Sequence, residues 1–118
     1  MAKPTYQIDH LSESINYGPI VVASTDNSTP TLLHTAHATN IDEIWLEAYN
    51  FGNTDVTLTI SYGGTNPENR IIQVIPASRG SIPLLKGIRC SGSLTVSAHA
   101  STANSVSIIG SVNRIVFV

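Results

Sequence analysis

The sequence predicts an all-β protein, a single antiparallel β-sandwich that is preceded by an extended amino-terminal arm. In "TDVTLTISY", the apolar residues Val56, Leu58, Ile60 and Tyr62 alternate strictly with polar ones, as in a half-buried strand. Short apolar runs recur roughly every 8–14 residues, with turn-forming residues between them and no convincing helix. Only 12% of the residues are charged, so solubility depends on Ser, Thr and Asn, which favour strands, turns and surfaces over helix interiors.

A chain of 118 residues is long enough for one domain and too short for two ordinary ones. Residues 1–18 carry scattered apolar side chains without a period, which predicts an extended arm, and residues 19–118 are predicted to form the sandwich. The strand order is not fixed by the sequence, so jelly-roll and immunoglobulin-like arrangements both stay open.

The remaining strands follow from short apolar or alternating runs that are bounded by Gly, Pro, Asn and Ser. Pro83 and Gly87 interrupt one of these runs, which predicts a bent strand at the edge of a sheet. The last run contains Gly110, where we expect a bend. The predicted strands outside the central region span residues 18–24, 31–36, 70–76, 81–90, 93–100 and 105–118.

The stretch from Ile41 to Asn50 admits two interpretations. Asn40 followed by Glu43 resembles a helix capping box. The alternating run after Asn53 favours a strand instead, joined to it as a β-hairpin through "FGNTD". As a strand, this stretch places Ile44, Leu46 and Ala48 on one face and Glu43, Trp45, Glu47 and Tyr49 on the other.

The net charge of −2 gives no general reason to bind nucleic acid or an anionic membrane, and no apolar run is long enough to span a bilayer. A single cysteine, Cys90, excludes an internal disulfide. All eight acids lie at or before position 68, whereas five of the six bases lie after it. In a lattice this asymmetry would give matching acidic and basic edges, but a sandwich interleaves both halves of its chain, and we favour that simpler interpretation.

No assembled catalytic, cofactor or metal site is predicted, and we expect no enzyme activity. His34 and His37 point to opposite faces of a strand, and no cysteine pair or metal-binding motif accompanies the four histidines. Cys90 is best interpreted as a packed apolar residue. Glu43 and Glu47 lie about 13 Å apart on a strand, which is too far for paired-acid glycoside hydrolysis.

The side chains around the tryptophan are instead predicted to bind a partner or a neighbouring subunit. This predicted partner surface comprises Glu43, Trp45, Glu47 and Tyr49, together with Tyr6 and Ile8 of the arm. Trp45 and Tyr49 would also suit weak binding of a sugar, which is the minor hypothesis.

Three segments support a resemblance to a known group of proteins. They read "TLLHTAHATNIDEIWLEAYNFGNTDVTLTISYGG", "IIQVIPASRGSIPLLKGIRCSGSLTVSAHA" and "SVSIIGSVNRI". In their apolar positions and turns, residues 31–115 resemble the small β-sandwich structural proteins of tailed-bacteriophage virions. Such proteins decorate the head as cement proteins or belong to the neck and tail, and the resemblance implies no catalytic residues.

The resemblance implies a capsid decoration protein of the virion, assembled in the host cytoplasm. Its expected partners are the major capsid protein and further copies of itself, as a homotrimer, with no nucleic acid or membrane. Two alternatives stay open: an accessory protein of the phage neck or tail, and a carbohydrate-binding β-sandwich module.

Overall fold

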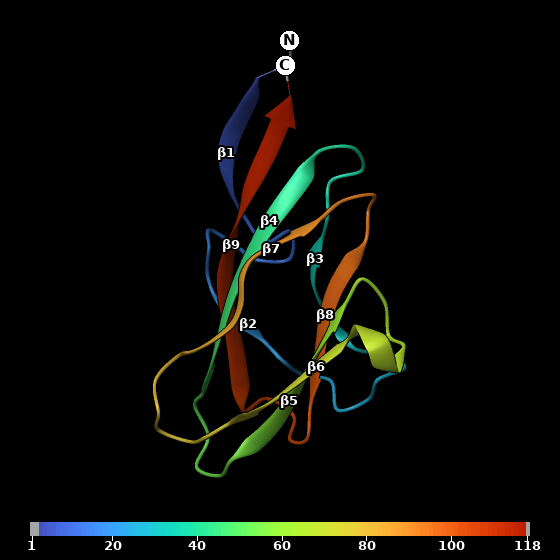
Figure 1. Cartoon of the computed structure of the whole chain (residues 1–118). Coiled ribbons are helices and arrows are strands. Elements are labelled where there is room, and N and C mark those ends of the chain that lie inside the picture. The colour runs from blue at the N-terminus through green and yellow to red at the C-terminus, as the bar shows by residue number, and fades with distance from the viewer. Residues whose placement is uncertain (1–2, 118) are drawn as a thin grey trace.

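The computed structural model describes residues 3–117, which form nine β-strands and one short 3-10 turn (Figure 1). The elements are β1 (Pro4–His10), β2 (Ile20–Val21), β3 (Thr31–Thr35), β4 (Ile41–Asn50), β5 (Val56–Tyr62), η1 (Pro67–Asn69), β6 (Arg70–Ile75), β7 (Ile82–Cys90), β8 (Thr95–Ala100) and β9 (Val106–Phe117). Sheet A has the order β1-β9-β4-β7, with β2 also paired to β9, and sheet B has the order β3-β8-β5-β6. The predicted all-β sandwich is confirmed.

The strand pairs are nested, which identifies the sandwich as a jelly roll. β5 pairs with β6, β4 with β7, β3 with β8 and β2 with β9, all antiparallel, as in one long hairpin rolled into two layers. The additional pairs β4–β9 and β5–β8 join these strands into the two sheets. Of the two arrangements that the sequence left open, the structure has the jelly roll.

The core lies between the two sheets and follows the predicted alternation. On β4 the inward residues Ile44, Leu46 and Ala48 are buried, and on β5 Val56, Leu58 and Ile60 are buried opposite them. Because side chains alternate along a strand, the intervening residues of β4 face outward. The predicted two faces of this strand are therefore confirmed.

The predicted hairpin between residues 41–50 and 54–62 is wrong, because the two strands belong to different sheets. β4 pairs with β7 and β9, whereas β5 pairs with β6 and β8. The buried Asn50 side chain stabilises the crossing: Nδ2 donates to the carbonyls of Thr54 (2.7 Å) and Ile75 (2.9 Å), and Oδ1 accepts from the Gly52 amide (2.8 Å). Turn-forming residues signal a change of direction, but they do not specify which strand is paired afterwards.

The amino-terminal segment is part of sheet A over residues 4–10 and is not a free arm there. β1 pairs with β9 from Pro4–Phe117 to His10–Ser111, and the outer end of this pair, where Pro4 lies opposite Phe117, extends beyond the body of the sandwich (Figure 1). Leu11 is buried in the core and Ser14 is also buried, so the segment before residue 18 packs onto the domain. Residues 1–2 of the predicted arm lie outside the described residues.

The predicted bent edge strand is confirmed in β7, which has no strand on its far side within residues 3–117. Its register with β4 shifts twice, between Ile44 and Trp45 and between Leu46 and Glu47. β9, which contains Gly110, pairs continuously with β4 across this residue, without a register shift.

Candidate functional site

All six residues of the predicted partner surface lie on the outer face of sheet A, spread along its length. Residues that are directly opposite in an antiparallel ladder share a face. Ile8 of β1 is opposite Asn113 of β9, which is opposite Glu43 of β4. Tyr6 is aligned in the same way with Ile115 and Ile41. The alternation along β4 adds the remaining members of this face, which are Trp45, Glu47 and Tyr49.

These six side chains differ in how available they are for contact. Ile8 is 74% exposed, Tyr6 63% and Trp45 42%, which are high values for large apolar side chains. Glu43 instead accepts a hydrogen bond from Arg89 Nε at 3.1 Å, which occupies its carboxylate. The exposed apolar side chains of this face therefore come from β1 and from the middle of β4.

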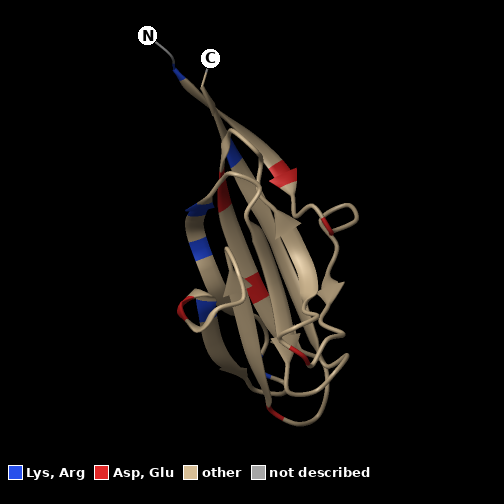
Figure 2. Ribbon diagram, turned by 90° about the vertical axis from the view of Figure 1, so that its right-hand side faces the viewer, with Lys and Arg blue, Asp and Glu red and all other residues tan. Residues whose placement is uncertain are grey.

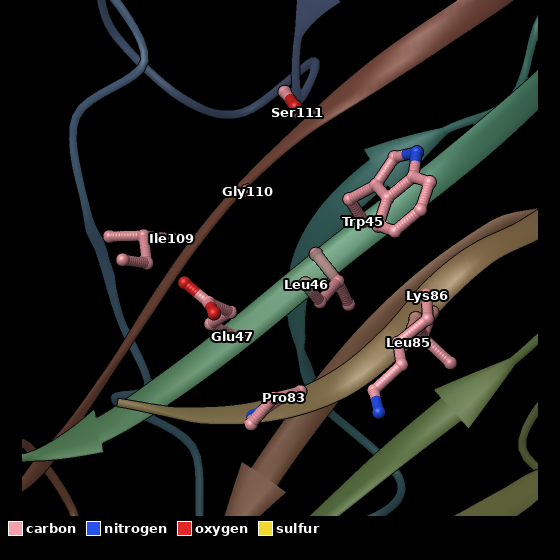
Figure 3. Close-up of a pocket in the computed structure, with 9 residues that line it drawn as sticks. All are labelled: Trp45, Leu46, Glu47, Pro83, Leu85, Lys86, Ile109, Gly110 and Ser111. Carbon is pink, nitrogen blue, oxygen red and sulfur yellow. The ribbon is translucent and has the colours of Figure 1, made fainter. Parts of the chain in front are cut away.

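A groove with a volume of about 410 Å³ lies beside Trp45 on this face (Figure 3). Three strands contribute its outward side chains: Trp45 and Glu47 from β4, Pro83 and Lys86 from β7, and Ile109 and Ser111 from β9. Gly110 lies in the floor, where a Cβ atom would meet the main-chain oxygen of Trp45. The close approach of β4 and β9 therefore requires glycine at this position.

Trp45 is held against the backbone of β7. A Cβ atom on Gly87 would lie only 2.9 Å from Cζ2 of the indole, and Gly87 has a φ of +75°, which disfavours other residues. A register shift of β7 occurs next to Trp45. The result is an aromatic side chain that packs against β7 and is partly exposed at the edge of a mainly apolar groove.

The two acids that flank Trp45 have separate surroundings. Glu43 pairs with Arg89, whereas Glu47 lines the groove together with Lys86. Among the described residues, Glu47 makes no ion pair. The groove can therefore offer one carboxylate, one ammonium group and one aromatic face to a ligand, which suits recognition of a polar or amphipathic group.

A second polar cluster lies inside the sandwich, where the sequence analysis predicted no site. The fully buried carboxylate of Asp42 receives hydrogen bonds from Arg114 Nε (2.8 Å) and Nη2 (3.2 Å) and lies 2.8 Å from His34 Nε2. The backbone amide of His37 donates to the same carboxylate at 3.1 Å. This cluster joins β3 of sheet B to β4 and β9 of sheet A.

The hydrogen bonds decide the ionisation of Asp42. Burial alone would raise the pKa of this carboxyl group, but the donors from Arg114, His34 and the His37 amide outweigh it and hold the pKa below its ordinary value. Hydrogen bonding to Asp42 raises the pKa of Arg114 in turn. Asp42 is therefore a paired, ionised group with a structural role rather than a proton donor.

The alternation along β4 contains a sequence signal for the buried cluster around Asp42. Asp42 and Asn50 have the same parity as Ile44, Leu46 and Ala48, so both polar residues lie on the buried face. A buried acid requires a partner. The sequence could not name that partner, since Arg114 is separated from Asp42 by 72 positions.

The histidines and the cysteine do not form a reactive set. His34 is buried beside Asp42, whereas Nδ1 of His37 accepts hydrogen bonds from the amides of Thr39 (3.1 Å) and Asn40 (2.9 Å) in a turn. Burial raises the pKa of the Cys90 thiol, which disfavours the nucleophilic thiolate. No group of three or more His, Cys, Asp or Glu side chains within residues 3–117 is arranged to hold a metal ion.

Charged residues are sparse and scattered over a mostly uncharged ribbon (Figure 2). Acids from the first half of the sequence form ion pairs with bases from the second half within sheet A: Arg114 contacts both Asp42 and Asp9, and Arg89 contacts Glu43. The two halves of the chain are thus interleaved, as the simpler interpretation of the charge asymmetry expects. None of the described residues belongs to a helix that is long and apolar enough to cross a membrane.

Comparisons with protein-family models, with curated proteins and with solved structures found no match to this chain.

Proposed function

We propose that this protein is a structural component of a bacteriophage particle, a capsid decoration protein that binds the major capsid protein through the outer face of sheet A. The observation that carries the proposal is the alignment of Tyr6, Ile8 and Trp45 on one face with high exposure. Exposed apolar residues gathered on one face are typical of protein interaction sites. The resemblance of residues 31–115 to virion proteins supplies the kind of partner.

The proposed mechanism is added contact rather than chemistry. Each bound copy buries Tyr6, Ile8 and Trp45 against the shell, and aromatic anchors of this kind contribute strongly to binding. A ligand that binds only the assembled shell stabilises that shell by mass action, and many copies act together. The ribbon of β1 and β9 extends the contact beyond the sandwich, and a homotrimer is the assembly that the resemblance implies.

The experiment is to add purified protein to shells that lack it and to count the bound copies per particle. A double variant, Ile8→Ser with Trp45→Ala, should lose most binding while its circular dichroism spectrum stays that of the wild type. Leu94→Ser is the matched control, because Leu94 is similarly exposed but does not belong to sheet A. Full binding by the double variant would contradict docking through this face, and only a few copies per native virion would favour the neck or tail.

A carbohydrate-binding module is the second candidate, and the contact between Trp45 and Gly87 favours it. A fixed, partly exposed indole beside Glu47, Lys86 and Ser111 offers a stacking surface next to hydrogen-bonding groups. A glycan array with Trp45→Ala as the control tests it. Binding above background that this variant loses would support the module, and the absence of such binding would end this candidacy.

A further inference from the structure

β6 offers an unprotected sheet edge. It pairs with β5 from Ser61–Arg70 to Val56–Ile75 without a register shift. On its other side, residues 70–74 have no strand partner within the described chain. The Asn50 side chain donates to the carbonyl of Ile75, and an isolated bridge joins Ala77 to Asn50. Main-chain groups on an open edge of this kind can form hydrogen bonds with an added strand.

The other edges of the two sheets carry features that hinder strand addition. β7 contains Pro83 and Gly87 and shifts register twice, β3 has an irregularity between Leu32 and His34, and β2 has only two residues. β1 begins with Pro4 directly after Lys3. Prolines, lysines, bulges and short strands are the usual protection of sheet edges. β6, with the sequence RIIQVI, has no proline, glycine, lysine or bulge.

The side chains of β6 are also unusually apolar for an exposed strand. Ile72 is 65% exposed and Val74 49%, and both lie on the outer face of sheet B opposite Thr59 and Thr57. Isoleucine and valine favour the strand conformation and pack well against a neighbouring strand. The edge and the face next to it therefore both suit an added apolar strand.

We propose that the strand added to this edge is β6 of a second copy, in antiparallel orientation. Glu68 lies just before β6 and Arg79 lies beyond its end. Both side chains are exposed, and neither makes an ion pair among the described residues. Antiparallel pairing brings Glu68 of each copy towards Arg79 of the other, whereas parallel pairing would bring like charges together.

This contact is independent of the proposed binding to a capsid, because it uses the edge of sheet B and not the outer face of sheet A. An antiparallel contact between identical strands has twofold symmetry and joins copies in pairs. In a closed trimer, one patch of each copy binds a different patch of the next copy. The twofold β6 contact is not of this kind, so in a trimer β6 would remain free to link one trimer to the next. Failure of the β6 contact would leave shell binding intact, and the reverse also holds.

The first test is sedimentation of the purified full chain over a range of concentrations. We expect dimers or other even-numbered assemblies, with slow hydrogen exchange of the β6 amides that speeds up on dilution. Val74→Lys should raise the dissociation constant by at least about tenfold, because a lysine on an edge strand opposes pairing. Ile88→Lys is the matched control, since Ile88 is comparably exposed on the protected edge strand β7 and should leave association unchanged.

The second test addresses the orientation. Glu68→Arg and Arg79→Glu should each weaken association, because each places like charges opposite one another. The double variant should restore it, because an arginine at position 68 of each copy then faces a glutamate at position 79 of the other. Circular dichroism checks that each variant folds. Monomers or trimers with unprotected β6 amides, an undiminished association of Val74→Lys, or a double variant weaker than both single ones would overturn the proposal.

Discussion

Nε2 of His34 lies 2.8 Å from Oδ2 of Asp42, and both side chains are almost completely buried between the two sheets. Arg114 completes the arrangement from β9, so three strands of both layers meet at one carboxylate. The other ring nitrogen of His34, Nδ1, accepts the amide of Ser12 at 2.9 Å. One polar cluster thus fixes the segment after β1 to the sandwich.

Asp42→Ala is expected to destabilise the protein by roughly 3–5 kcal/mol, because it leaves Arg114 and His34 without their buried partner. Urea unfolding followed by circular dichroism measures this loss. Glu43→Ala is the matched control, since it removes the neighbouring acid, whose partner Arg89 is largely exposed, and should cost less than about 1 kcal/mol. Equal losses in the two variants would contradict the structural role of Asp42.

The contribution of Asp42 to stability should depend on pH in the acid range. The pKa of this carboxyl group is lowered in the folded protein, so the folded state favours the ionised form relative to the unfolded state. The stabilisation is therefore fully present above the unfolded pKa of about 3.9 and is lost as the pH falls through the lower folded pKa.

This dependence can be measured as the difference in unfolding free energy between the wild type and Asp42→Asn from pH 2 to pH 7. The difference should stay constant above about pH 5 and shrink below about pH 4. A difference that grows on acidification would mean that the sign of the pKa shift is wrong.

The ring of His34 should be the neutral tautomer with its proton on Nε2. Since the Ser12 amide donates to Nδ1, that nitrogen carries no proton, and Nε2 donates to Asp42. Long-range proton–nitrogen NMR spectra at neutral pH distinguish the tautomers by the different shifts of the two ring nitrogens. A proton on Nδ1 would be incompatible with the hydrogen bond from Ser12.

Gly87→Ala should displace the only tryptophan as well as strain the backbone. The new Cβ atom would lie 2.9 Å from the indole of Trp45, at a φ of +75°. We expect a shifted tryptophan fluorescence maximum and a loss of more than about 1 kcal/mol. Gly92→Ala separates the two causes, because Gly92 has a φ of +65° but nothing within 4 Å of the added atom. An unchanged spectrum for Gly87→Ala would contradict the contact.

The sequence by itself determined most of the strands, although not β1, and the buried faces of β4 and β5. Strict alternation placed Ile44, Leu46 and Ala48 inside and Trp45 and Glu47 outside, and the structure agrees. Proline and glycine in residues 81–90 marked β7 as an edge strand. These features are local, because the period of two and the conformational limits of proline and glycine act within a few residues.

Only the tertiary structure decided which strands are neighbours. The connection after Asn50 was predicted as a hairpin and instead crosses between sheets, and residues 4–10 pair with the end of β9 at the other end of the chain. The partners of Asp42 and the groove beside Trp45 depend on these pairings. Strand pairing is a choice among competing non-local contacts, and the free energy of the whole sandwich settles it, so no short segment contains the answer.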